Sequence, residues 1–232
     1  MVWKVPKMWE GGECWILGGG PSLPRQFGVP QEVIDAVLEG LASPSEYSPY
    51  MSEIHGRHVI GINAAYLLGD WIDMVFWGDK RFYLEHRQAL ADFPGLKVTC
   101  HPKLNVKTYR DDNIKYLIRD KGHPRGISRD PGRVGWNMNS GAAAISIAAN
   151  AGAVRIVLVG FDMHMNGTGH WHSVYRKKGR TDPKKAPYSR HLRGFEQIAK
   201  DAKKRGIQIL NACPESAIQE LKKITVEKAL QL

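Results

Sequence analysis

Cysteine is scarce in this sequence, and long apolar runs are missing from it. Three cysteines occur among the 232 residues, Cys14, Cys100 and Cys213, and no two of them form a CxxC pair, which argues against a cysteine zinc site. We expect buried, reduced thiols in a cytoplasmic protein. No stretch is long enough to span a bilayer, and the first residues lack the apolar run of a signal peptide.

Two familiar phosphate-binding fingerprints are also missing. The chain has no GxxxxGK(S/T) loop, and its glycine-rich loop at 18–22 lacks the third glycine of the dinucleotide motif. There is no internal repeat and no low-complexity tract. These absences exclude a Walker A loop and weigh against a standard dinucleotide site.

Basic residues are in excess and are concentrated in two stretches. The formal net charge is +10. Residues 163–193 hold eight Lys or Arg residues against Asp182 alone, and residues 101–135 hold nine basic residues against four acidic ones. This pattern favours an acidic partner, which is nucleic acid (DNA or RNA), a nucleotide or an anionic glycan. A merely well-solvated basic surface gives the same composition.

Short apolar runs alternate with helical patterns along the chain. Continuous apolar runs suit strands buried on both faces of a parallel sheet, and we expect strands at 14–18, 58–62, 74–78, 96–100, 155–161 and 207–212. Helices are predicted at 30–41, 80–93, 139–151, 188–205 and 216–230. The fold expected is therefore α/β, a Rossmann-like, doubly wound, mostly parallel sheet in one domain, 1–232. Two long connections, 102–138 and 163–190, are expected to be lid or substrate loops.

Small and polar residues follow several of the predicted strands. The run Gly18-Gly19-Gly20-Pro21-Ser22 fits either a phosphate loop or a tight turn, and the strand before it favours phosphate contact, with Ser22 as a donor. Ser140 and Gly141 open a predicted helix whose N–H groups also suit a phosphate. Because strands of such folds end at one edge, these segments predict a nucleotide or sugar-nucleotide site.

Two further polar residues have alternative roles. Asn63 follows a strand. Its amide can hydrogen-bond to a base edge or a ribose hydroxyl, or it can cap a helix. Asp79 suits either a ribose or a metal ion, or the cap of the helix that begins near Lys80.

Acidic and imidazole side chains cluster after the strand at 155–161. Asp162, His164, His170 and His172 suit either a divalent metal such as Mg²⁺ or Mn²⁺, with Asp162 as a ligand, or contacts to a leaving phosphate. The spacing matches no recognised zinc pattern. His191 opens a helix in the basic region and is a candidate general base, although an isolated histidine is more often a surface residue.

The order of these motifs resembles a known family. GGGPSL at 18–23, GINAAY at 61–66, MVFWGD at 74–79, the run from Asn139 to Gly167, SRHLRGFE at 189–196 and NACPES at 211–216 look like the bacterial sialyltransferases of glycosyltransferase family 42. They also resemble motility-accessory-factor-like domains, which include archaeal 6-hydroxymethylpterin pyrophosphokinases.

The resemblance implies roles for particular residues. It implies that Gly18, Gly20, Ser22 and Asn63 hold the nucleotide, with further contacts from Ser140 and Gly141, and that His191 is the catalytic base. Two tyrosines that assist the leaving phosphate in the sialyltransferases fall on His164 and His170, and a cytidine-contacting asparagine falls near Gly78, beside Asp79. These departures suit a diphosphate donor at least as well as CMP-sialic acid.

Three hypotheses follow for the function. The first is a glycosyltransferase-like enzyme that moves a sugar from a nucleotide sugar to an acidic acceptor. The second is a pyrophosphokinase that uses ATP and Mg²⁺ held by Asp162 or Asp79. The third is a non-catalytic nucleic-acid-binding protein on the same fold, with Trp136, Trp171 and Tyr175 available for stacking.

Overall fold

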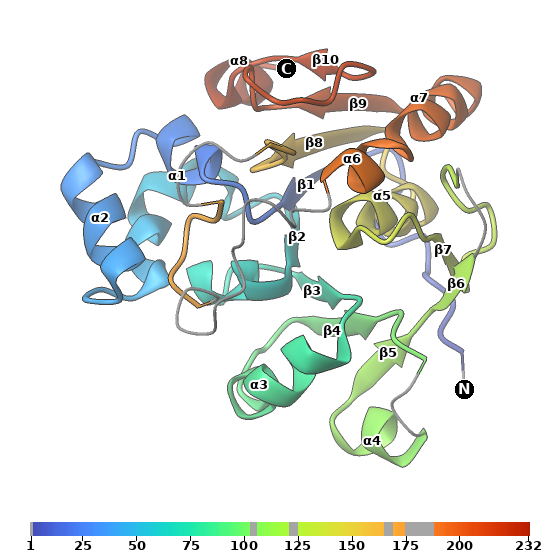
Figure 1. The fold of residues 1–232 in the computed structure, drawn as a ribbon. Helices are drawn as coiled ribbons and strands as arrows, with labels where there is room; N and C mark the ends of the chain where they lie inside the picture. Colours follow the sequence, from blue (N-terminus) through green and yellow to red (C-terminus); the bar gives the residue numbers. More distant parts are fainter. Residues whose placement is uncertain (1, 103–105, 121–124, 165–168, 175–187) are drawn as a thin grey trace.

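One large parallel sheet organises the molecule (Figure 1). The computed structural model describes residues 2–102, 106–120, 125–164, 169–174 and 188–232. Within these residues the sheet has eight strands in the order β10-β9-β8-β1-β2-β3-β4-β5. Their bounds are β1 Glu13–Leu17, β2 His58–Ile62, β3 Met74–Trp77, β4 Leu96–Thr99, β5 Ile114–Tyr116, β8 Arg155–Val159, β9 Gln208–Asn211 and β10 Lys222–Lys223.

Strand order reverses at the centre of the sheet. Strand β1 pairs in parallel with β2 on one side and with β8 on the other. The chain builds outward from β2 to β5 and then returns to β8, β9 and β10. This is the doubly wound, Rossmann-like topology expected from the sequence, and ligands of such folds bind outside the strand carboxyl ends where the order switches.

Helices cover both faces of the sheet, as the continuous apolar runs predicted. Cys14 and Ile16 point to the face covered by α5 (Ser140–Asn150) and α7 (Phe195–Lys204), whereas Trp15 and Leu17 point to the other. The second face is covered by α2 (Gln31–Glu39), α3 (Lys80–Ala91), α8 (Val226–Leu230) and two 3₁₀ segments, η1 (Pro44–Ile54) and η2 (Asn63–Leu68). All six predicted strands are present.

The expected connection over 102–138 contains secondary structure. It holds α4 (Val106–Asp111) and β5, followed by β6 (Ile118–Asp120) and β7 (Arg133–Gly135), which form a separate two-stranded sheet. The remaining short helices are α1 (Ser22–Gln26) and α6 (Tyr188–Leu192). The helix predicted over 188–205 is therefore two helices, α6 and α7, interrupted at Arg193 and Gly194.

The helix predicted over 216–230 is wrong for most of its length. Only α8 is helical, and it begins after Thr225, whose hydroxyl accepts from the N–H of Lys228 at 3.2 Å. The hydroxyl of Ser216 donates to the Phe161 carbonyl at 2.6 Å and holds this segment against the sheet. Strand β10 then extends the sheet beside β9. The apolar side chains of Ile218 and Leu221 are therefore buried at the edge of the sheet.

Cys14, Cys100 and Cys213 are buried free thiols, as predicted. Among the described residues, no helix combines the length and apolar character needed to cross a bilayer.

Helix α5 depends on small side chains. Residues Gly141 through Asn150 are all buried, and Ala143 has no exposed surface. We predict that Ala143→Leu lowers the free energy of unfolding by about 1–3 kcal/mol, because the close-packed core has no room for the larger side chain. Urea unfolding measures the change.

Ala91→Leu is the matched control, because Ala91 is the exposed last residue of α3. Its free energy of unfolding should stay within about 0.5 kcal/mol of the parent. Equal losses in the two variants would contradict this account of α5.

Candidate functional site

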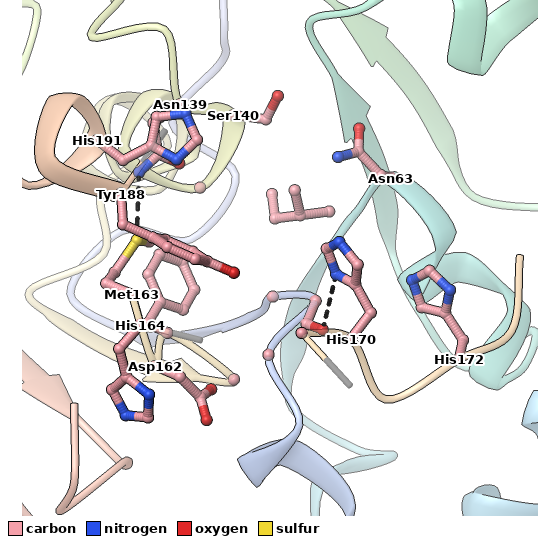
Figure 2. A pocket seen from close by; sticks show the side chains of 18 of the residues that line it. Asn63, Asn139, Ser140, Asp162, Met163, His164, His170, His172, Tyr188 and His191 are labelled. Atoms are coloured by element: carbon pink, nitrogen blue, oxygen red, sulfur yellow. Dashed lines mark hydrogen bonds between the residues drawn. The ribbon is translucent and has the colours of Figure 1, made fainter. Parts of the chain in front are cut away.

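A cavity of about 320 Å³ opens at the carboxyl ends of β1, β2 and β8 (Figure 2). Its wall brings together segments that are far apart in the sequence, including ten of the predicted site residues: Gly18, Gly19, Gly20, Asn63, Ser140, Gly141, Asp162, His164, His170 and His191. Its volume is within the range of small-molecule sites. The cavity lies where the topology of the sheet predicts a ligand site.

The glycine-rich loop is fixed to the strand beside it. The N–H of Gly18 donates to the Val159 carbonyl at 2.8 Å, and that of Gly20 donates to the Gly160 carbonyl at 2.9 Å. A Cβ on Gly20 would collide with the carboxylate of Asp162. The loop therefore approaches the end of β8 more closely than a chain with side chains can.

The carboxylate of Asp162 anchors the far end of the same loop. Its two oxygens accept from the Ser22 N–H at 3.1 Å and from the Ser22 hydroxyl at 2.8 Å. Ser22, expected as a phosphate donor, therefore has both donors engaged here and is not among the residues that line the cavity. Burial raises the pKa of Asp162, against the lowering effect of the bonds from Ser22.

The N-terminus of α5 forms another part of the wall. Asn139 caps the helix by accepting from the N–H of Ala142 at 3.2 Å. Ser140 and Gly141 follow in the first turn and line the cavity. Because the first N–H groups of a helix have no partner within it, this end suits an anion such as a phosphate.

Backbone strain is concentrated around the cavity. Asn63, Met138 and Met163 line it and have left-handed φ values of 51°, 58° and 57°. Among the described non-glycine residues, only Asn113 shares this conformation. Such strain costs about 1–3 kcal/mol per residue and is found mainly at functional sites. The sequence gives no signal for the two methionines, because methionine is not a turn-forming residue.

Asn63 also carries a buried atom without a partner. Its Oδ1 is buried and has no hydrogen-bond partner. Its side chain does not cap η2, so the helix-cap alternative is wrong for this residue. A buried acceptor is normally satisfied, and Asn63 is one of the residues that line the cavity.

The histidines of the cavity wall bond to backbone carbonyls. The Nδ1 of His170 donates to the Gly19 carbonyl at 3.2 Å, and the Nε2 of His164 donates to the Glu215 carbonyl at 3.1 Å. The Met138 carbonyl favours the protonated form of a third imidazole, that of His191. His170 also stacks on His172, with 5.3 Å between the ring centroids.

Burial keeps three imidazoles at the cavity neutral. It lowers the pKa of His170, and it lowers the pKa of His172 well below the usual value, with further lowering from His170 and His86. Burial, together with the charge of Arg190, lowers the pKa of His191 to about 4. His170, His172 and His191 are therefore uncharged at neutral pH.

The described residues do not fit a divalent metal ion. Both oxygens of Asp162 already bind Ser22, and no group of three His, Cys, Asp or Glu side chains in the described part of the chain is placed to hold a metal. Asp79 accepts from the N–H of Arg81 at 2.9 Å and caps α3, and it does not line the cavity.

The three aromatic residues expected to stack on nucleic-acid bases, Trp136, Trp171 and Tyr175, are not shown to do so. Trp171 is fully buried, and its indole N–H donates to the Gly18 carbonyl at 2.8 Å, so it is not a stacking platform. Trp136 faces the guanidinium of Arg119 at 3.8 Å. Tyr175, the basic residues of 176–185 and most of the expected lid at 163–190 lie outside the described residues.

The fold and the cavity define a Rossmann-like α/β protein with a ligand site at the switch point of its sheet. No protein-family model matches the chain, and no curated protein matches it significantly. Among solved structures, a variant of the sialyltransferase CST-II in complex with CMP is similar over 92% of this chain and 86% of its own, with a TM-score of 0.51 and 15% identity.

Two further structures match the same share of this chain. CST-II in complex with a trisaccharide acceptor and CMP has a TM-score of 0.47 at 15% identity over 86% of its own length. CstII from Campylobacter jejuni in complex with cytidine-5'-monophosphate has a TM-score of 0.43 at 14% identity over 84%. At this identity the 0.51 match bears on the fold alone, which is a distant sialyltransferase-like fold.

The close contact at Gly20 can be tested directly. We predict that Gly20→Ala lowers the free energy of unfolding by about 1–3 kcal/mol, because the new Cβ displaces Asp162 and lies 2.7 Å from the Gly160 carbonyl oxygen. Gly56→Ala is the control, because a Cβ there meets nothing within 4 Å. Chemical denaturation compares the two variants. A Gly20→Ala protein as stable as the control would contradict the close contact between Gly20 and Asp162.

The buried imidazoles predict a pH dependence of stability. The folded-state pKa values of His170, His172 and His191 are lowered, so the unfolded chain binds more protons below pH ~6.5. Stability is therefore complete above that pH and falls on acidification, by up to about 1.4 kcal/mol per pH unit for each imidazole. Urea unfolding at pH 7.0, 6.0 and 5.0 measures the slope.

His172→Leu should reduce this slope, because it removes the most deeply buried of the three imidazoles. His58→Gln, which removes an exposed histidine, is the matched control for histidine number. An identical slope in parent and His172→Leu would contradict the prediction.

Proposed function

We propose that the protein is a glycosyltransferase-like enzyme that binds a nucleotide sugar in this cavity and transfers the sugar to an acceptor hydroxyl. One observation carries the proposal. A glycine-rich loop, the N-terminus of α5, Asn63 with its unpartnered Oδ1 and the neutral imidazole of His191 all belong to the wall of one cavity at the switch point of the sheet. The sialyltransferase structures with a similar fold contain CMP.

The nucleotide would be held by groups of three elements. Ser140 and Gly141 at the start of α5 would bind the phosphate through N–H groups and a hydroxyl. Gly18 and Gly20 let the loop lie close against the end of β8, and the loop would present its backbone to the ligand. The Oδ1 of Asn63 would accept from an amino, imino or hydroxyl group of the nucleoside. Ser22 would act indirectly, by holding the loop to Asp162.

His191 would be the general base. The neutral imidazole of His191 has one nitrogen with a lone pair, which would accept the proton of the acceptor hydroxyl. The acceptor oxygen then bonds to the anomeric carbon of the sugar. The bond between that carbon and the phosphate oxygen breaks, and its electron pair stays with the phosphate. A bound phosphate raises the basicity of His191, because a nearby negative charge favours the imidazolium.

An acidic acceptor, either nucleic acid or an anionic glycan, is part of the proposal. The net charge of +10 favours it. The described residues offer no ligand set for the metal-dependent pyrophosphokinase hypothesis. The nucleic-acid-binding hypothesis loses Trp171 as a stacking residue, because that side chain is buried.

The test is a panel of CMP-, UDP-, GDP- and ADP-sugars and ATP, with Mn²⁺ and Mg²⁺ or with EDTA, in which released nucleotide is quantified. We expect slow hydrolysis of one sugar nucleotide. His191→Gln should lower its kcat about 10²- to 10⁴-fold, because the base is lost, and should change the Kd of the free nucleotide less than about threefold.

His58→Gln controls for the loss of a histidine far from the cavity wall and should keep full turnover. Cleavage of ATP alone, and only with metal, would replace this proposal by pyrophosphoryl transfer. Full turnover by His191→Gln would remove His191 from the mechanism.

A further inference from the structure

The described wall of the cavity has no permanently charged cation. None of the described residues that line it is a lysine or an arginine, and burial keeps His170, His172 and His191 neutral. The whole chain nevertheless has a formal net charge of +10. An acidic acceptor that reacts at this cavity therefore needs a cationic partner next to the wall rather than in it.

The short helix α6 provides such a cation. Tyr188 and His191 line the cavity, and Figure 2 shows both side chains pointing into it from the same side. Arg190 lies between them in the sequence, directly before the proposed base, and is exposed. It forms no ion pair with any residue in the described part of the chain. Its guanidinium is therefore available to a ligand.

The charge of Arg190 acts on His191. Burial lowers the pKa of His191 to about 4, and the positive charge of Arg190 adds to this lowering, whereas the Met138 carbonyl opposes it. Tyr188 lies edge-on to the imidazole, with 6.4 Å between the ring centroids, and is a neutral phenol because burial raises its pKa. Among the described side chains, Arg190 is thus the charged group that acts on the proposed base.

We propose that Arg190 binds an anionic group of the acceptor and so places the acceptor hydroxyl beside His191. The inference rests on the proposed function and specifies the acceptor as an acidic sugar that carries a carboxylate. A guanidinium fits this group, because it donates two parallel hydrogen bonds to a carboxylate. A glycan suits the site better than nucleic acid does, because Trp171 is buried and cannot stack on a base.

Binding of an acidic acceptor also makes His191 a stronger base. The carboxylate neutralises the charge of Arg190, so the pKa of His191 rises toward the usual value for histidine. A base is most effective when its pKa is near the working pH. A neutral acceptor leaves the charge of Arg190 in place and the basicity of His191 low.

The first test measures the effect of Arg190 on His191 without any substrate. Two-dimensional ¹H–¹³C NMR follows the histidine rings as the pH is lowered, and His191→Gln assigns the signal. We expect the ring of His191 to titrate at a higher pH in Arg190→Gln than in the parent, because a nearby positive charge is removed. Arg190→Lys keeps the charge and should titrate like the parent.

Arg110→Gln is the matched control, because Arg110 is an exposed arginine of α4, a helix that lies far from α6 in Figure 1. Its His191 ring should titrate as in the parent. Identical titrations of the parent and Arg190→Gln would overturn the inference, because Arg190 would then be too far from the proposed base.

The second test uses acceptors that differ in one group. Methyl β-glucuronide has a carboxylate where methyl β-glucoside has a hydroxymethyl group, and each is offered with the nucleotide sugar that the panel selects. We expect kcat/KM to favour the glucuronide about fivefold or more, as for a partly exposed, charge-assisted hydrogen bond. Arg190→Gln should lower this preference below about twofold, whereas Arg110→Gln should keep it.

The ratio of the two acceptors is measured within each variant, so a partly inactive preparation does not change it. A parent that does not prefer the glucuronide, or an equal preference in Arg190→Gln, would overturn the inference and leave the proposed function standing. Transfer to a single-stranded oligonucleotide but to neither sugar would do the same. Release of nucleotide from no sugar nucleotide in the panel would remove both the proposed function and the inference.

Discussion

The bond between Asp162 and Ser22 is the constraint on which the rest of the site depends. It joins the end of β8 to the end of the loop that follows β1, across the switch point of the sheet. Gly20 permits the approach, because any side chain there would occupy the position of the carboxylate. The carbonyls of Gly18 and Gly19 in this loop accept from the indole N–H of Trp171 and from the Nδ1–H of His170. The buried carboxylate of Asp162 thus fixes the position of the glycine-rich loop, and the loop fixes the position of the His170 imidazole through the Gly19 carbonyl.

Left-handed residues lie in the segments around this loop. Met163 follows Asp162 directly and is left-handed, and Met138 is left-handed where the chain enters α5. The amide of Asn139 contacts the sulfur of Met163 at 3.9 Å and links these two segments. A rigid sheet edge and a fully buried helix hold this geometry, which is what a preorganised site requires.

The sequence predicted the sheet well because its signals are local. Continuous apolar runs that end in Gly, Asn or Asp marked β1, β2, β3 and β8, and their carboxyl ends located the cavity. The segment 216–230 was mispredicted, because an amphipathic repeat does not reveal that a strand edge of β9 is open beside it. Asn63 and Asp79 looked alike as residues after strands, yet Asp79 caps a helix and Asn63 does not. That difference depends on the backbone conformation of Asn63, which is left-handed.

Hydrogen-bond direction is a further property that no local pattern contains. The tautomer of His170 is set by Gly19, and that of His164 by Glu215, residues far away in the sequence. A histidine in a motif therefore indicates that proton chemistry is available without indicating which nitrogen faces the ligand. These bond directions are found only in the folded chain, because each carbonyl reaches its imidazole from a segment more than fifty residues away.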